Sequence, residues 1–126
     1  MERVLIVFAA GGLGCVVRYL IGLWAAQRLD QAFPYGTLIV NVIGSFLIAL
    51  VLELSLRIAS FPPNLRLALT TGFMGGLTTY SSFNYETTTL ATTGSSGKAL
   101  INIAVTLVSC IFAGLAGLWV ARRLTG

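Results

Sequence analysis

Four apolar segments separated by short polar stretches make up the pattern of this chain. They run from about residue 4 to 26, 36 to 56, 66 to 90 and 99 to 121. An α-helix rises 1.5 Å per residue, so about 20 apolar residues are needed to cross a hydrocarbon core of about 30 Å. The pattern therefore predicts an all-α membrane protein with four transmembrane helices in a single domain, residues 1–126.

The third segment departs from the pattern of a lipid-facing helix at Thr71–Phe83. This stretch holds three glycines, five Ser or Thr residues and three aromatic residues. Non-helical backbone at membrane depth is tolerated only where protein or a water-filled path satisfies its polar groups. We therefore predict that the third helix is interrupted near Gly75–Thr79 and lines a pathway for a small ion.

The interruption offers two kinds of ion contact. A break near Gly75–Gly76 would leave the carbonyls of Gly75–Thr78 without helical partners, so that they could coordinate a cation. The next helix would point its positive N-terminal end at the site, and Tyr80 and Phe83 would present positive ring edges to an anion. Alternatively, Gly72 and Gly76 form a GxxxG packing seam.

The other segments carry isolated polar residues that allow two interpretations each. Asn41 either holds a neighbouring helix or donates its amide hydrogens to a species that moves through the protein. Arg18 costs at least about 2.5 kcal/mol inside a span, and it either snorkels to the interface or attracts anions in an aqueous vestibule. Asn102, Thr106 and Ser109 share one helical face, where the hydroxyls either line a pathway or bond to their own backbone.

The composition argues against an enzyme. The chain is 56% hydrophobic and only 10% charged, it has no histidine, and its acids are isolated. Neither a paired carboxylate nor a nucleophile beside a base is apparent, and no glycine-rich loop follows a strand pattern. The net charge of +4 does not indicate nucleic acid, because the basic residues lie mostly at segment ends. The four acids are Glu2, Asp30, Glu53 and Glu86.

The basic residues also carry information on topology. Four spans place both termini on one side of the membrane, and that side holds five basic residues against two on the other. For a chain with a single orientation, this bias favours both termini inside the cell. The five are Arg3, Arg57, Arg66, Arg122 and Arg123, and the two are Arg28 and Lys98.

Three stretches resemble motifs of the Fluc (CrcB) family of fluoride channels. Residues 11–19 (GGLGCVVRY) resemble the glycine-rich opening of the family, which ends in Arg-Tyr. Residues 36–46 (GTLIVNVIGSF) resemble its GTLxVNxxGSF segment. Residues 72–83 (GFMGGLTTYSSF), together with Glu86, resemble its GfxGgxTTFSTFxxE segment. The three motifs follow in order and at the spacing of the family, and the chain length agrees.

The resemblance implies a passive fluoride-selective channel of the bacterial inner membrane. It implies a homodimer of antiparallel, dual-topology subunits with two pores and a structural Na⁺ at its centre, held by the backbone carbonyls of Gly75 and Thr78. The antiparallel arrangement comes from the resemblance alone, since the charge bias favours one orientation. The implied pore residues are Asn41, Thr79, Tyr80, Ser81, Phe83 and Glu86, with Arg18 at a vestibule; Thr106 and Ser109 are added from the polar face of the fourth segment.

The chain departs from the family pattern at two positions. Residue 80 is Tyr where the pattern has Phe, and residue 82 is Ser where Thr is usual. The added Tyr80 hydroxyl can hold the ion or rearrange the ring, so we expect a Tyr80→Phe variant to conduct faster.

A small four-helix membrane protein is also compatible with two other functions. One is a proton-coupled exporter of the small multidrug-resistance type, which needs a carboxylate buried in mid-membrane. Glu53 and Glu86 instead lie toward segment ends. The other is a non-conducting assembly subunit, which the small-residue seams would allow.

Overall fold

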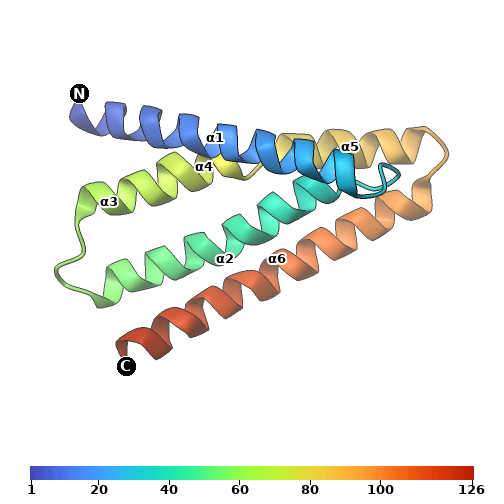
Figure 1. The fold of residues 1–126 in the computed structure, drawn as a ribbon. Helices are drawn as coiled ribbons and strands as arrows, with labels where there is room; N and C mark the ends of the chain where they lie inside the picture. Colours follow the sequence, from blue (N-terminus) through green and yellow to red (C-terminus); the bar gives the residue numbers. More distant parts are fainter.

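Three long helices and one broken helix form the computed structural model, which describes all 126 residues (Figure 1). Helix α1 spans Glu2–Arg28, α2 spans Tyr35–Arg57 and α6 spans Ser96–Thr125. Each is long and apolar enough to cross a membrane. The observed helices are slightly longer than the predicted apolar segments because their last turns continue through the flanking basic residues.

The predicted third segment is divided into four helical pieces. Helix α3 spans Pro63–Leu67, the wide π-helix η1 spans Ala68–Met74, α4 spans Gly75–Leu77 and α5 spans Tyr80–Thr92. Between α4 and α5 the chain is extended. Short π-helical stretches inside helices are rare and occur frequently at functional sites.

The break lies at Thr78 and Thr79, whose φ/ψ angles are −82°/156° and −152°/118°. The more specific expectation of a break at Gly75–Gly76 is corrected, because Gly75 keeps helical angles of −61° and −35°. The β-branched side chains of the two threonines suit extended backbone. The glycines are used for a different purpose.

That purpose is close packing of α1 against η1 and α4. A Cβ atom added to Gly14 would overlap the carbonyl oxygen of Phe73, and one added to Gly76 would overlap that of Gly11. A Cβ on Gly72 would come within 2.7 Å of Ala10 Cβ. The packing-seam interpretation of Gly72 and Gly76 is therefore confirmed.

The arrangement of the helices brings both termini to the same end of the bundle (Figure 1). The first part of the broken helix (α3, η1 and α4) lies along α1, whereas α5 packs against α6. Helix α2 lies along α6. At the end with the termini, Glu53 Oε1 accepts from Arg57 Nε at 2.8 Å and from Arg122 Nε at 3.0 Å. This bridge ties α2 to α6 at the membrane interface.

Candidate functional site

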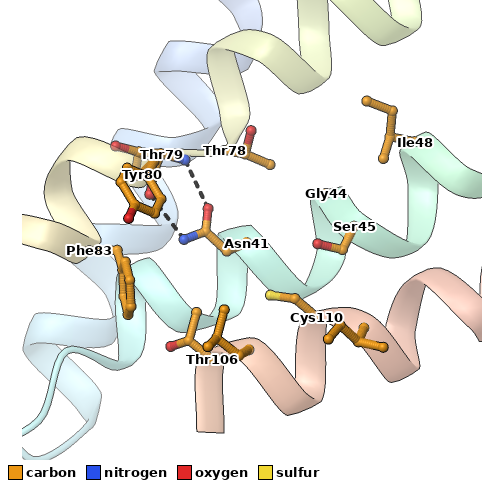
Figure 2. A pocket seen from close by; sticks show the side chains of 12 residues that line it. Asn41, Gly44, Ser45, Ile48, Thr78, Thr79, Tyr80, Phe83, Thr106 and Cys110 are labelled. Atoms are coloured by element: carbon orange, nitrogen blue, oxygen red, sulfur yellow. Dashed lines mark hydrogen bonds between the residues drawn. The ribbon is translucent and has the colours of Figure 1, made fainter. Parts of the chain in front are cut away.

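Asn41 of α2 holds the break in the third helix. Its Nδ2 donates to the carbonyl oxygen of Thr79 at 3.0 Å, and its Oδ1 accepts from the Thr79 N–H at 2.8 Å (Figure 2). The Thr79 N–H and C=O have no helical partners at the break, and the Asn41 amide replaces those partners. Buried polar groups require such partners. Of the two interpretations of Asn41, the helix-holding one is what these bonds show. Since an amide has two N–H donors, one remains free for another acceptor.

Thr79 in turn caps helix α5. Its Oγ1 accepts from the Ser82 N–H at 3.2 Å, and the Ser81 and Ser82 hydroxyl oxygens lie 3.2 and 3.1 Å from it. A threonine at this position satisfies one of the free N–H groups of the first turn. Helix α5 therefore begins in a cluster of three hydroxyls.

The same bonds leave two carbonyl oxygens without their helical donors. The Thr79 N–H, which would otherwise reach back to Gly75, donates to Asn41. The Ser82 N–H, which would reach back to Thr78, donates to Thr79 Oγ1. These two carbonyls are the ones predicted from the family resemblance to hold a cation. Gly75 is exposed and Thr78 is half-buried in the protomer.

A groove of about 450 Å³ opens beside the break, between α2, α5 and α6 (Figure 2). The rings of Tyr80 and Phe83 meet there with their centroids 5.7 Å apart and their planes tilted by 52°. Phe83 is buried, whereas Tyr80 is 77% exposed in the protomer. The groove is lined by Asn41, Gly44, Ser45, Ile48, Thr78, Thr79, Tyr80, Phe83, Thr106, Leu107, Cys110 and Ile111.

A chain of hydrogen bonds leads from the groove along α5 and α6. Thr106 Oγ1 lies 3.4 Å from Asn102 Oδ1, and Asn102 Nδ2 donates to Thr87 Oγ1 at 2.8 Å. Asn102 is only 1% exposed. The sequence placed Asn102 on the polar face of the fourth segment but did not include it in the site. Its spacing of four residues from Thr106, which places the two side chains on one helical face, could have indicated that it belongs to the site.

Glu86, one turn from Phe83, lies outside the groove. Its Oε1 accepts from Thr37 Oγ1 of α2 at 2.7 Å, while its Oε2 is buried without a hydrogen-bond partner. Thr37 was missed by the sequence analysis, because nothing in the sequence signals a contact between residues 37 and 86.

Three other predicted pore residues are also absent from the groove lining. Ser109 donates its hydroxyl to the carbonyl oxygen of Val105 in its own helix. Arg18 is half-buried on α1 and donates to Cys15 Sγ at 3.5 Å. Ser81 is exposed beside Thr79. The groove thus brings together Asn41, Thr79, Tyr80, Phe83 and Thr106 out of the predicted pore residues.

Comparison with known proteins gives matches along nearly the whole chain. The family model described as CrcB-like protein, Camphor Resistance (CrcB), matches residues 5–118. The fluoride-specific ion channel FluC of Sorangium cellulosum is 50% identical over 124 residues, which cover 98% of each chain. The protein of the same name from Citrifermentans bemidjiense is 45% identical over 124 residues, which cover 98% of this chain and 100% of that one. That from Anaeromyxobacter sp. (strain K) is 46% identical over 126 residues, the full length of both chains.

Proposed function

Because this chain belongs to the CrcB family of fluoride-specific ion channels, we propose that it conducts fluoride passively through the groove beside the broken helix. It is a multi-pass membrane protein. Its relatives are ion channels and not enzymes, in agreement with its lack of a catalytic set of side chains. The observation that carries the proposal is the clamped break at Thr78–Thr79, which sets neutral donors and ring edges beside one groove.

The chemistry of the groove suits a small, strongly hydrated anion. A pore must replace the hydration shell of such an ion with donors that are weak enough to release it. The free N–H of Asn41 and the Thr106 hydroxyl are neutral donors, and the edges of Tyr80 and Phe83 carry positive quadrupole. None of these groups bears a full charge, so the ion is attracted without being trapped.

Fluoride efflux from proteoliposomes tests this function. Vesicles that contain the full chain are loaded with fluoride or with chloride and diluted into ion-free buffer with no proton gradient. We expect rapid loss of fluoride and retention of chloride, measured with ion-selective electrodes. Equal loss of both anions would sink the claim of selectivity, and a requirement for a proton gradient would indicate coupled transport.

We further propose that two antiparallel copies form the channel, each with its own groove. The break places polar backbone at membrane depth, where lipid cannot satisfy it. In one copy Gly75 and Tyr80 remain exposed beside the break. A second copy packed on this face would cover them. The antiparallel orientation rests on the family resemblance, because the basic residues favour a single orientation.

A sodium ion fits the two carbonyls at this face. The Gly75 and Thr78 oxygens have lost their helical donors to Asn41 and Thr79, and oxygen ligands are what a hard cation prefers. Two copies would contribute four such oxygens. When bound, the ion would supply positive charge that holds the carbonyl dipoles of the two copies together. The chain itself supplies the unwound backbone that presents them.

Tyr80→Phe is expected to speed fluoride efflux several-fold at an unchanged unfolding temperature. The Tyr80 ring lines the groove, and its hydroxyl has no hydrogen-bond partner within the protomer, so removing it costs no internal bond. The hydroxyl remains available to hold a passing anion. Initial efflux rates measure the effect. Tyr85→Phe is the matched control, because Tyr85 lies on the same helix, is 72% exposed and does not line the groove. Equal rates for Tyr80→Phe and the unchanged chain would place the hydroxyl off the ion path.

The exporter alternative has less support. A proton-coupled exporter needs a carboxylate that is free to exchange protons and substrate in mid-membrane. Glu53 is paired with Arg57 and Arg122 at the end of α2. Glu86 is bound by Thr37 and lies outside the groove.

A further inference from the structure

A basic pocket lies at the end of the bundle that carries both termini. It has a volume of about 340 Å³ and opens between α1, α2, α3 and η1, with Arg3 and Arg66 among its lining residues. The hydroxyl-bearing residues Thr70 and Thr71 lie in the same pocket. Neither arginine forms a salt bridge. Two uncompensated guanidinium groups therefore share one site at the membrane interface.

Glu2, the acid next to Arg3 in the sequence, neither lines the pocket nor forms a salt bridge with either arginine. Glu2 Oε1 accepts from Asn64 Nδ2 at 2.8 Å, a bond that ties the start of α1 to the start of α3. Arg3 is adjacent to Glu2 and Arg66 lies two residues after Asn64, so this bond also holds the two arginines at the same end of the bundle. The two guanidinium groups are free to contact a ligand.

An apolar groove continues from the basic pocket toward the middle of the bundle. It is lined by Val4, Val7 and Phe8 of α1 and shares Arg3 and Leu67 with the pocket. Phe8 is 80% exposed. It follows Arg3 by five residues, which places it about 7.5 Å deeper along the helix axis. Charge at the interface with apolar surface below it is the profile of a phospholipid.

We propose that this composite surface binds an anionic phospholipid. The phosphate contacts Arg3 and Arg66, and an acyl chain lies along Val4, Phe8 and Leu67. Guanidinium groups match phosphate geometry with paired N–H donors, and basic pockets between transmembrane helices are suited to anionic headgroups. A net positive pocket favours an anionic lipid over a zwitterionic one of the same chain length.

A second copy of the chain is a poorer occupant, because each of its carboxylates already accepts a hydrogen bond within its own protomer. Glu2 is bound to Asn64, and Glu53 is paired with Arg57 and Arg122. Glu86 accepts from Thr37. Asp30 accepts from the N–H of Ala32 at 2.9 Å. All four acids of the chain thus have at least one oxygen bonded within their own protomer, whereas lipid phosphate is abundant at the depth of Arg3.

Lipid titration of the full chain in detergent tests the proposal. Dioleoylphosphatidylglycerol is compared with dioleoylphosphatidylcholine, with bound lipid counted by native mass spectrometry and the unfolding temperature measured in parallel. We expect retention of the phosphatidylglycerol and a higher unfolding temperature in its presence. The variant Arg3→Gln/Arg66→Gln should weaken retention at least tenfold. The control Arg28→Gln/Lys98→Gln removes the same charge at the opposite end of the bundle and should retain the lipid.

Four results would overturn the proposal. The first is equal retention of the two lipids. The second is an equal loss of lipid retention in the two double variants. The third is a rise in unfolding temperature with inorganic phosphate that equals the rise with phosphatidylglycerol, which would define an anion site without an acyl-chain site. The fourth is a change in the monomer–dimer ratio of Arg3→Gln/Arg66→Gln without a change in bound lipid, which would assign the pocket to a second copy. A further variant, Phe8→Asn, keeps both arginines and should weaken lipid retention while leaving any effect of inorganic phosphate unchanged.

Discussion

Replacement of Asn41 by leucine should lower fluoride efflux at least tenfold and lower the unfolding temperature. Leucine has a similar size but no polar atoms, so the buried N–H and C=O of Thr79 would both lose their partner. Each unsatisfied buried group costs about 1–3 kcal/mol, so the total is about 2–6 kcal/mol. Since this clamp sets the direction of α5, its loss would also displace the rings of Tyr80 and Phe83.

Two measurements separate the clamp from a role in the pore alone. Thermal unfolding without fluoride reports on the clamp, and efflux reports on the pathway. A residue that only donates to the passing ion would change efflux and leave unfolding unchanged. Asn84→Leu makes the same chemical change at an exposed residue of α5 that has no side-chain hydrogen bond, and it should unfold like the unchanged chain. Equal unfolding temperatures for the Asn41 and Asn84 variants would show that the clamp contributes no stability.

Replacement of Gly14 by alanine should disrupt the seam between α1 and the broken helix. The new Cβ would overlap the Phe73 carbonyl oxygen and lie 3.0 Å from the Leu77 nitrogen. These are backbone atoms that cannot rotate away, so α1 must move outward. Overpacking of this kind costs about 1–3 kcal/mol. Because η1 and α4 lead directly into the break, we also expect at least a tenfold loss of efflux.

Gly12→Ala is the control for the seam. It makes the same substitution two residues away on the same helix, and its Cβ would meet no atom within 4 Å. The gain in helix propensity is the same in both variants, so it cancels. Efflux of the Gly12 variant should match that of the unchanged chain, and its unfolding temperature should be equal or slightly higher because of the gain in helix propensity. If the Gly14 variant behaved like the Gly12 variant, α1 would have to be free to shift without cost.

The Gly14 and Asn41 predictions concern contacts made by two different helices, α1 and α2, with the same break. Gly14 brings α1 close to the turn before the break, and Asn41 fixes the residue that begins the turn after it. Thr79 is thus positioned from α2, while Gly76 is positioned from α1. The groove and the free carbonyls of Gly75 and Thr78 depend on both contacts, and we therefore expect the two substitutions to affect stability and conduction together.

Helical spacing predicted only part of the arrangement of the aromatic pair Tyr80 and Phe83. Tyr80 and Phe83 are three residues apart, so their shared face followed from helical spacing. The 5.7 Å separation of their rings agrees with that expectation. Their unequal exposure did not follow from spacing, because it depends on where α2 and α6 pack. Phe83 is covered by these helices, and Tyr80 extends beyond them.

The sequence by itself determined the class of the protein and its parts. Bilayer thickness sets the length of an apolar span, so four segments could be counted without any contact being known. Polar and glycine residues inside the third segment marked the place where the helix breaks, because lipid cannot satisfy exposed backbone. The motifs around Gly11, Asn41 and Tyr80 indicated the family, to which the chain belongs.

Only the tertiary structure decided which residue carries the break and which polar groups meet. The break moved from Gly75–Gly76 to Thr78–Thr79 because Asn41, 38 residues away in the chain, offers a carbonyl and an amide to the Thr79 backbone. Glu86 likewise accepts a hydrogen bond from Thr37, which is 49 residues away in the chain. Such partners depend on how α2 packs against the broken helix, and helical periodicity within one segment carries no information on that packing.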